Sequence, residues 1–181
     1  MNLFDLDSDI ITMNVDGKDM EMRHSICFGK EYDKWLVSRC GIVWSIMYHR
    51  VLPGTKQWSK KDKNNQKRIL GLRHVMSFME EDWWGDSSGR PTWHKNRNGY
   101  QRDIAAHKMI MDTWAPLYDN PPEGIVWEEW EIVRDLPTVY NHISKTVVID
   151  HIDDDPTNNH LNNLRRVTSW DNNTHRKARG I

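Results

Sequence analysis

The residues best suited to chemistry lie close together near the C-terminal end of the sequence. Asp150 and His151 are adjacent, and Asn172 follows them further along the chain. A carboxylate and an amide oxygen are ligands that Mg²⁺ accepts while it keeps several waters. A neutral imidazole can take the proton of an attacking water. These side chains together suit metal-assisted hydrolysis of a phosphodiester bond.

Local signals predict the elements that position these groups. The β-branched run 146–152 indicates a strand, and it ends with Asp150 and His151. A polar loop follows, 164–167 can return as the antiparallel strand, and Thr168 or Ser169 can cap a helix that runs to about residue 178. The expected β-loop-β-α unit covers about 146–178. Its helix carries Asn172 in the first turn and Arg176 one turn later on the same face, where Arg176 could hold a phosphate.

The order of these residues resembles a known family. Asp-His, then Asn-Asn, then Asn-Leu-Arg-x-Val-Thr, then Asn-Asn is similar to the phage and intron-type branch of the HNH (ββα-metal) endonucleases, which are often site-specific homing endonucleases or nickases. The resemblance implies that His151 is the general base, that Asp150 and Asn172 bind the metal, and that Asn163 braces the loop. It also implies one Mg²⁺ or Mn²⁺ ion per site, double-stranded DNA as the substrate, and a phage or mobile-element origin.

Two weaker resemblances lie upstream, and one position departs from the family pattern. The segment 100–114 is similar to the helix that commonly precedes the motif, and 32–46 resembles a β-module associated with DNA binding. Asp154 stands where the family often has glycine, so we expect a left-handed backbone there. An EF-hand calcium loop starting at Asp153 is excluded, because Asn158 and Leu164 stand where glycine and glutamate are required.

The first hundred residues predict mainly β-structure. A first hairpin is expected from strands at 10–15 and 18–22, with Asp16-Gly17 as its turn. A second hairpin is expected from strands at 35–38 and 42–47. Three further expectations follow: a helix over 68–84, a loop over 85–99, and a helix capped by Asp103 and ended by Pro116. Segment 119–144 receives no assignment. The predicted fold class is α+β, with a β-rich DNA-binding region at 1–99 and an HNH module at 100–181.

Basic residues gather in one stretch of the otherwise balanced chain, which has 25 Lys and Arg against 26 Asp and Glu. Such a run is commonly a solvated surface, but beside a nuclease motif it also suits contact with phosphates. The residues that we expect to contact DNA are Lys60, Lys61, Lys63, Lys67, Arg68 and Arg165. We expect His160 and His175 to be solvated, and His107 to pack on the apolar face of its helix. The ten tryptophans are expected to serve mainly in packing.

Composition excludes several classes of protein. Two cysteines without a CxxC pair exclude a structural zinc held by four cysteines and indicate a chain free of disulfides. No segment has the apolar length of a membrane span or the pattern of a signal peptide, so a cytoplasmic protein is expected. Because the sequence ends soon after the predicted catalytic helix, we expect the first hundred residues to recognise the DNA.

Three functions remain compatible with the sequence. The first is a site-specific DNA endonuclease, which would nick as a monomer and would need a dimer or two events for a double-strand break. The second is an inactive HNH scaffold that binds DNA as a regulator or packaging accessory. The third is a nuclease that acts on RNA or without sequence preference. The oligomeric state is left open by the sequence.

Overall fold

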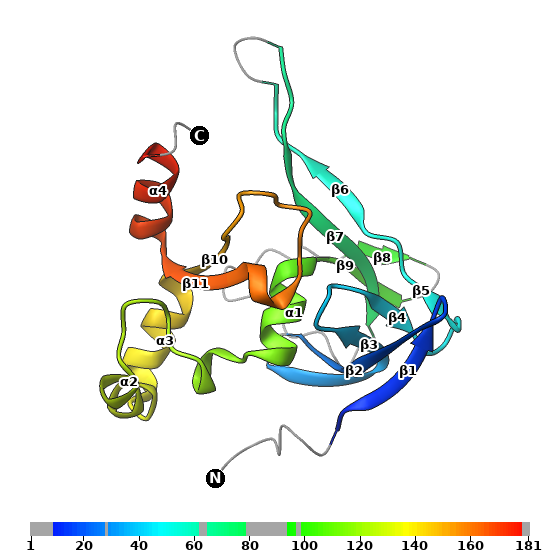
Figure 1. Ribbon diagram of the computed structural model, residues 1–181, viewed down its shortest axis with the longest axis horizontal. Helices are drawn as coiled ribbons and strands as arrows, with labels where there is room; N and C mark the ends of the chain where they lie inside the picture. Colours follow the sequence, from blue (N-terminus) through cyan, green and yellow to red (C-terminus); the bar gives the residue numbers. More distant parts are fainter. Residues whose placement is uncertain (1–8, 28, 62–64, 79–93, 97–98, 179–181) are drawn as a thin grey trace.

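The fold is α+β, as the sequence predicts. The computed structural model describes residues 9–27, 29–61, 65–78, 94–96 and 99–178 (Figure 1). Two antiparallel sheets and helix α1 share one hydrophobic core, and a smaller two-stranded unit with helix α4 follows at the C-terminal end. In the described part of the chain, no helix is long and apolar enough to cross a membrane.

The first sheet has five strands in the order in which they occur along the chain. Its strands are β1 (Ile11–Val15), β2 (Lys18–Cys27), β3 (Lys30–Ser38), β4 (Val43–Ser45) and β5 (Arg50–Val51). Both expected hairpins are confirmed. Asp16 and Gly17 have φ of 52° and 83° in the first turn, and Gly41 has φ of 91° in the second. Positive φ at these positions is what a tight turn requires.

The second sheet has the order β6-β7-β9-β8. Its strands are β6 (Thr55–Trp58), β7 (Ile69–Phe78), β8 (His94–Asn96) and β9 (Gly99–Ala105). The helix expected over 68–84 is therefore wrong for 69–78. His74 and Met76 are buried while Val75 between them is exposed, which is the period of two that a half-buried strand shows. Tertiary pairing with β6 and β9 overrides the helical pattern.

The loop expected over 85–99 is partly wrong, because 94–96 form strand β8. The remainder of that loop, apart from Gly99 in β9, lies outside the described residues. Strand β9 begins at the expected domain boundary and pairs with β7 on the other side of it. The division into 1–99 and 100–181 stays a prediction.

Helix α1 (Ala106–Trp114) is shorter at its start than expected. Asp103 is not its cap, because this residue belongs to β9 and lies opposite Val75. Ala105 precedes the helix and makes no side-chain capping bond. The buried face of α1 includes Met109, Ile110 and Trp114, which pack in the core formed with both sheets. The helix ends before Pro116, as predicted.

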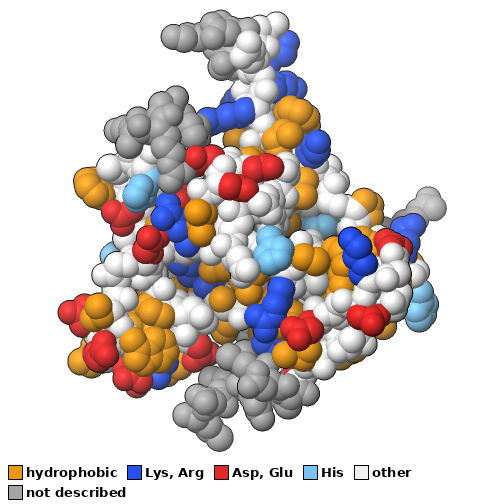
Figure 2. Space-filling view, viewed as in Figure 1, with side chains coloured by type: hydrophobic (Ala, Val, Ile, Leu, Met, Phe, Trp, Pro, Cys, Tyr) orange, Lys and Arg blue, Asp and Glu red, His pale blue; other side chains and the backbone are white. Residues whose placement is uncertain are grey.

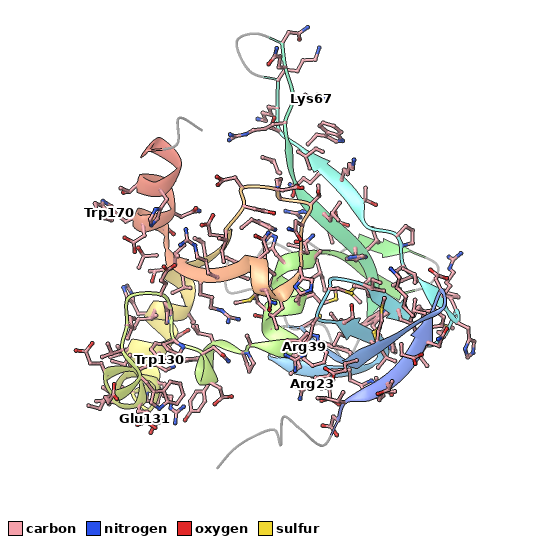
Figure 3. The ribbon with its side chains drawn as sticks, in the orientation of Figure 1. Arg23, Arg39, Lys67, Trp130, Glu131 and Trp170 are labelled. Carbon is pink, nitrogen blue, oxygen red and sulfur yellow. The ribbon has the colours of Figure 1, made fainter. Side chains whose placement is uncertain are left out.

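The segment that the sequence left unassigned forms helices α2 (Trp127–Arg134) and α3 (Pro137–Thr146) after a 3-10 turn at Leu117–Asp119. Trp130 is fully buried, and its indole N–H donates to the carbonyl of Tyr118 at 3.0 Å. The rings of Trp130 and Tyr140 have centroids 6.0 Å apart. This aromatic contact holds the helical segment together, on the far side of β10–β11 from the projecting β6–β7 hairpin (Figures 1 and 3).

The predicted β-loop-β-α unit is confirmed. Strand β10 (Val147–His151) pairs antiparallel with β11 (Leu164–Thr168), a 3-10 turn at Leu161–Asn163 precedes β11, and α4 (Ser169–Ala178) follows it. Thr168 accepts the Asp171 N–H at 3.1 Å, so Thr168 is the cap of α4. Within this unit, Asp150, His151 and Asn172 line one cleft.

Candidate active site

A surface cleft of about 620 Å³ lies between β10, the following loop, α4 and the β6–β7 hairpin. Three residues predicted to act in chemistry line it: Asp150, His151 and Asn172. Two basic residues of the hairpin, Lys56 and Arg68, line its other side. Residues separated by about a hundred positions in the sequence therefore share one cleft, which has acidic, basic and amide groups on its walls.

Asp150 lies at the end of β10, directly opposite Arg165 in β11. Its Oδ2 accepts hydrogen bonds from Nε and Nη2 of Arg165 at 3.1 and 2.9 Å. Arg165 also donates from Nη1 to Glu123 Oε2 at 2.9 Å. Both of these hydrogen bonds are accepted by Oδ2 of Asp150. The predicted DNA contact of Arg165 stays a prediction, and in this structure the guanidinium lies between two carboxylates.

His151 is buried at the end of the same strand, with 9% of its surface exposed. Its Nε2 lies 3.0 Å from Oδ1 of Asn159. Its ring meets the ring of His107 edge to face, with centroids 5.4 Å apart. Burial, and secondarily the charge of His151, lowers the pKa of His107 to about 4. His107 is therefore neutral at physiological pH. It is half-buried, packs beside His151 and lines the cleft, so it does not belong to the buried face of α1 on which we expected it.

Asn163 braces the loop that connects β10 to β11. Its amide nitrogen donates to Asp153 Oδ1 at 2.8 Å and to the Asn158 carbonyl at 2.9 Å, and its Oδ1 accepts the Asp153 N–H at 3.1 Å. Hydrogen bonds from Asn158 and Asn163 lower the pKa of the Asp153 carboxyl. Asp154 has φ of 63°, which confirms the expected left-handed backbone. One amide side chain thus ties both ends of the loop.

Asn172 enters the cleft from α4. Its Oδ1 is shielded from solvent and, among the described residues, has no hydrogen-bond partner. A buried amide oxygen without a donor carries a desolvation cost, which a bound cation would offset. In the described part of the chain, no group of three or more His, Cys, Asp or Glu side chains could hold a metal by itself. An ion here would need Asp150, amide oxygen, water and substrate oxygens.

The β6–β7 hairpin projects away from the sheet and carries the basic stretch (Figure 1). Lys60, Lys61, Lys67 and Arg68 are exposed, and Lys67 lies near the outer end of the hairpin (Figure 3). Lys and Arg side chains gather along this arm in Figure 2, beside acidic side chains of the neighbouring loop. Lys63 and the side chain of Arg176 lie outside the described residues, so both predictions stay untested.

Two residues of this site escaped the sequence reasoning. Lys56 belongs to the basic stretch but was not singled out, and it lines the cleft. Asn159 was assigned only to loop formation, yet it is 5% exposed and contacts His151. The neighbouring Asn158 is exposed and bonds to Asp153 instead. A pair of consecutive asparagines contains no local signal that separates these two roles.

Comparison with known proteins adds one structural likeness. No protein-family model and no curated protein matches the sequence. A solved structure described as "DNA binding and cleavage by the HNH homing endonuclease I-HmuI" is 20% identical with a TM-score of 0.44. The alignment covers 84% of this chain and 56% of that chain, so this chain spans little more than half of its length. A likeness at this level does not establish a shared fold or activity.

Proposed function

We propose that this protein is a metal-dependent DNA endonuclease of the HNH type. The observation that carries the proposal is the cleft itself, where Asp150, His151 and the unpartnered amide oxygen of Asn172 meet. Catalytic hydrolysis of a phosphodiester needs a base for the water and charge stabilisation for the phosphate. The cleft has a candidate for each requirement, and the basic hairpin adjoins it.

The chemistry follows from these side chains. Asp150 and Asn172 would hold one Mg²⁺ or Mn²⁺ ion, which when bound neutralises charge on the phosphate and on the leaving 3′ oxygen. His151 would accept the proton of a water that attacks phosphorus. The bond to the 3′ oxygen breaks, which leaves 3′-hydroxyl and 5′-phosphate ends. Asn163 would keep the loop, and with it the end of β10, in the geometry that this step requires.

Double-stranded DNA is the proposed substrate. Lys60, Lys61, Lys67 and Arg68 are exposed on the hairpin, and Arg68 also lines the cleft. A two-stranded ribbon fits the major groove, and basic side chains on it would contact phosphates on either side. We propose site-specific, homing-type cleavage with one strand cut per site. Lys63 and Arg176 are proposed as further phosphate contacts on the basis of the sequence alone.

One observation favours a second function. The carboxylate of Asp150 is already neutralised by Arg165 through two hydrogen bonds, with only 11% of the Asp150 side chain exposed. If that ion pair persists on DNA, the carboxylate would contribute little to metal binding. The protein would then be a DNA-binding protein that retains the HNH scaffold without cleavage.

Cleavage of a supercoiled plasmid and of genomic DNA tests the proposal. Incubation with Mg²⁺ should yield nicked or linear forms, EDTA should prevent this, and His151→Ala should lower the rate by about 10²–10⁴. His142→Ala is the matched control, because His142 is exposed on α3 and does not line the cleft. Binding without cleavage in any divalent metal would reject the nuclease and favour the scaffold function.

A further inference from the structure

The orientation of the Asn159 amide is determined by its two contacts. Its Nδ2 donates to the carbonyl of Thr157 at 3.2 Å, and a carbonyl can only accept. Its Oδ1 therefore faces His151, with Nε2 of the imidazole at 3.0 Å. An amide oxygen also only accepts, so Nε2 must carry a proton. The neutral ring then has its lone pair on Nδ1.

The β3–β4 turn of the first sheet supports Asn159 from behind. Gly41 has φ of 91°, and a Cβ at this position would lie 3.2 Å from the backbone oxygen of Asn159 and 3.3 Å from its Cβ. Both contacts are tighter than ordinary van der Waals distance, and neither belongs to the far end of a flexible side chain. Only glycine fits between the turn and Asn159 without displacing one of them.

Two further sets of bonds make this support rigid. The carbonyl of Arg39 accepts the Leu161 N–H at 2.7 Å, which ties the turn to the loop two residues beyond Asn159. Within the turn, the buried Ser38 hydroxyl accepts the Ile42 N–H at 2.9 Å, and its backbone N–H donates to the Ile42 carbonyl at 2.9 Å. The turn, the loop and the imidazole are therefore connected through short contacts.

We infer that Asn159 is a positioning residue for His151, and that Gly41 in the β3–β4 turn holds Asn159 in place. Together, Asn159 and Gly41 keep the His151 ring in one orientation. The proton is then on Nε2, and Nδ1 is the basic atom. The first sheet thus contributes to the cleft without lining it. The consequence for DNA cleavage rests on the proposed function, whereas the state of the ring does not.

The state of the ring can be measured without DNA or metal. In protein with ¹⁵N-labelled histidine, at about pH 8.5 where an ordinary imidazole is neutral, His151 should show a slowly exchanging proton bonded to Nε2. His151→Gln assigns this signal among the nine histidines. Asn159→Ala should remove the protected proton, and Asn159→Asp should retain it because a carboxylate accepts the same bond.

Gly41→Ala tests whether the β3–β4 turn holds Asn159 in place. This variant also provides an independent test if Asn159→Ala does not fold. The substitution should weaken or shift the His151 proton signal. Gly17→Ala is the matched control, since Gly17 also has a positive φ of 83° but has no atom within 4 Å of an added Cβ. Gly17→Ala should leave the signal unchanged, as should Asn162→Ala at an exposed loop position.

Cleavage kinetics separate this inference from the proposed function. If the protein cuts DNA, Asn159→Ala should lower kcat about 10–100-fold, as for other partners of an active-site histidine, while DNA affinity is unchanged. Asn159→Asp should recover part of the loss. A proton on Nδ1 in the parent protein, or an Nε2 proton that survives Asn159→Ala, would overturn the inference. A protected Nε2 proton in a protein that cuts no DNA would reject only the nuclease.

Discussion

The β10–β11 loop and the β6–β7 hairpin border the same cleft but are built in opposite ways. In the loop, polar side chains bond to one another and to the backbone, with Asn163 and Asp153 at the centre of the network. In the hairpin, the basic side chains are exposed on a two-stranded arm that projects from the sheet. Preorganised groups suit chemistry, whereas solvated cations suit contact with a polyanion. The comparison predicts that the two regions respond to different perturbations.

Among the changes that test this comparison, the largest effect is expected from the amide oxygen of Asn172 in the cleft. Asn172→Ala should lower kcat by about 10²–10³, because a metal contributes several kcal/mol of charge stabilisation. Weaker Mn²⁺ binding should accompany the loss, and excess metal should restore part of the activity. Asn173→Ala, at the neighbouring exposed position, is the control. Equal loss in both variants would mean that α4 as a whole is damaged, and not the proposed metal ligand alone.

The hairpin should affect binding and leave the chemical step unchanged. Replacing Lys60, Lys61 and Lys67 together with alanine should reduce the salt dependence of DNA affinity, with a slope smaller by about 0.9 for each lost phosphate contact. The rate at saturating DNA should stay close to that of the parent. A Lys18→Ala variant, altered at an exposed lysine of the first sheet, provides the control. An unchanged slope would show that these cations are only solvated.

Acidification should destabilise the base of the hairpin before it affects the loop. Burial lowers the pKa of His74 in β7 to about 4, from an ordinary value of 6.5. The unfolded chain therefore binds more protons between these pH values, and stability is complete above pH 6.5 and falls as the pH drops toward 4. The contribution of His74 to this loss should reach about 3 kcal/mol. It is measured as the difference between the free energies of urea unfolding at pH 7 and at pH 4.5.

His74→Gln should remove about half of this pH dependence, because burial lowers the pKa of His107 by a similar amount, and His142→Gln at an exposed site should remove none of it. Hydrogen bonds lower the pKa of Asp153 and Asp155 below the ordinary 3.8, so these carboxylates contribute above that value and lose their effect only at lower pH. A similar slope in His74→Gln and in the parent would contradict the assignment of this pH dependence to His74.

The smallest effect is expected from Asn163, which braces the β10–β11 loop. Asn163→Ala removes three hydrogen bonds at a half-buried position and should lower the free energy of unfolding by about 1–2 kcal/mol. Asn162→Ala, exposed and one residue away, should stay within about 0.5 kcal/mol of the parent. If the two variants unfold alike, the network around Asn163 is not what orders the loop.

Local chemistry was enough to predict the β10–β11–α4 unit. The β-branched run over 146–152, the polar loop and the cap at Thr168 each act between neighbours in sequence, so their pattern can be read without knowing the fold. The same holds for the turns at Asp16-Gly17 and Gly41, and for Asp154, where few residue types accept the backbone conformation. Asp150, His151 and Asn172 could be grouped because short elements connect them.

Tertiary structure decided what depends on partners distant in sequence. Strand β7 forms because β6 and β9 pair with it, although its apolar residues alone were compatible with a helix. Three contacts of the site join segments that lie far apart along the chain. Arg165 pairs with Glu123 and Asp150, Arg68 lines the cleft, and Asn159 packs against Gly41. A contact between distant residues leaves no local pattern in a single sequence, because its energy depends on how whole elements pack.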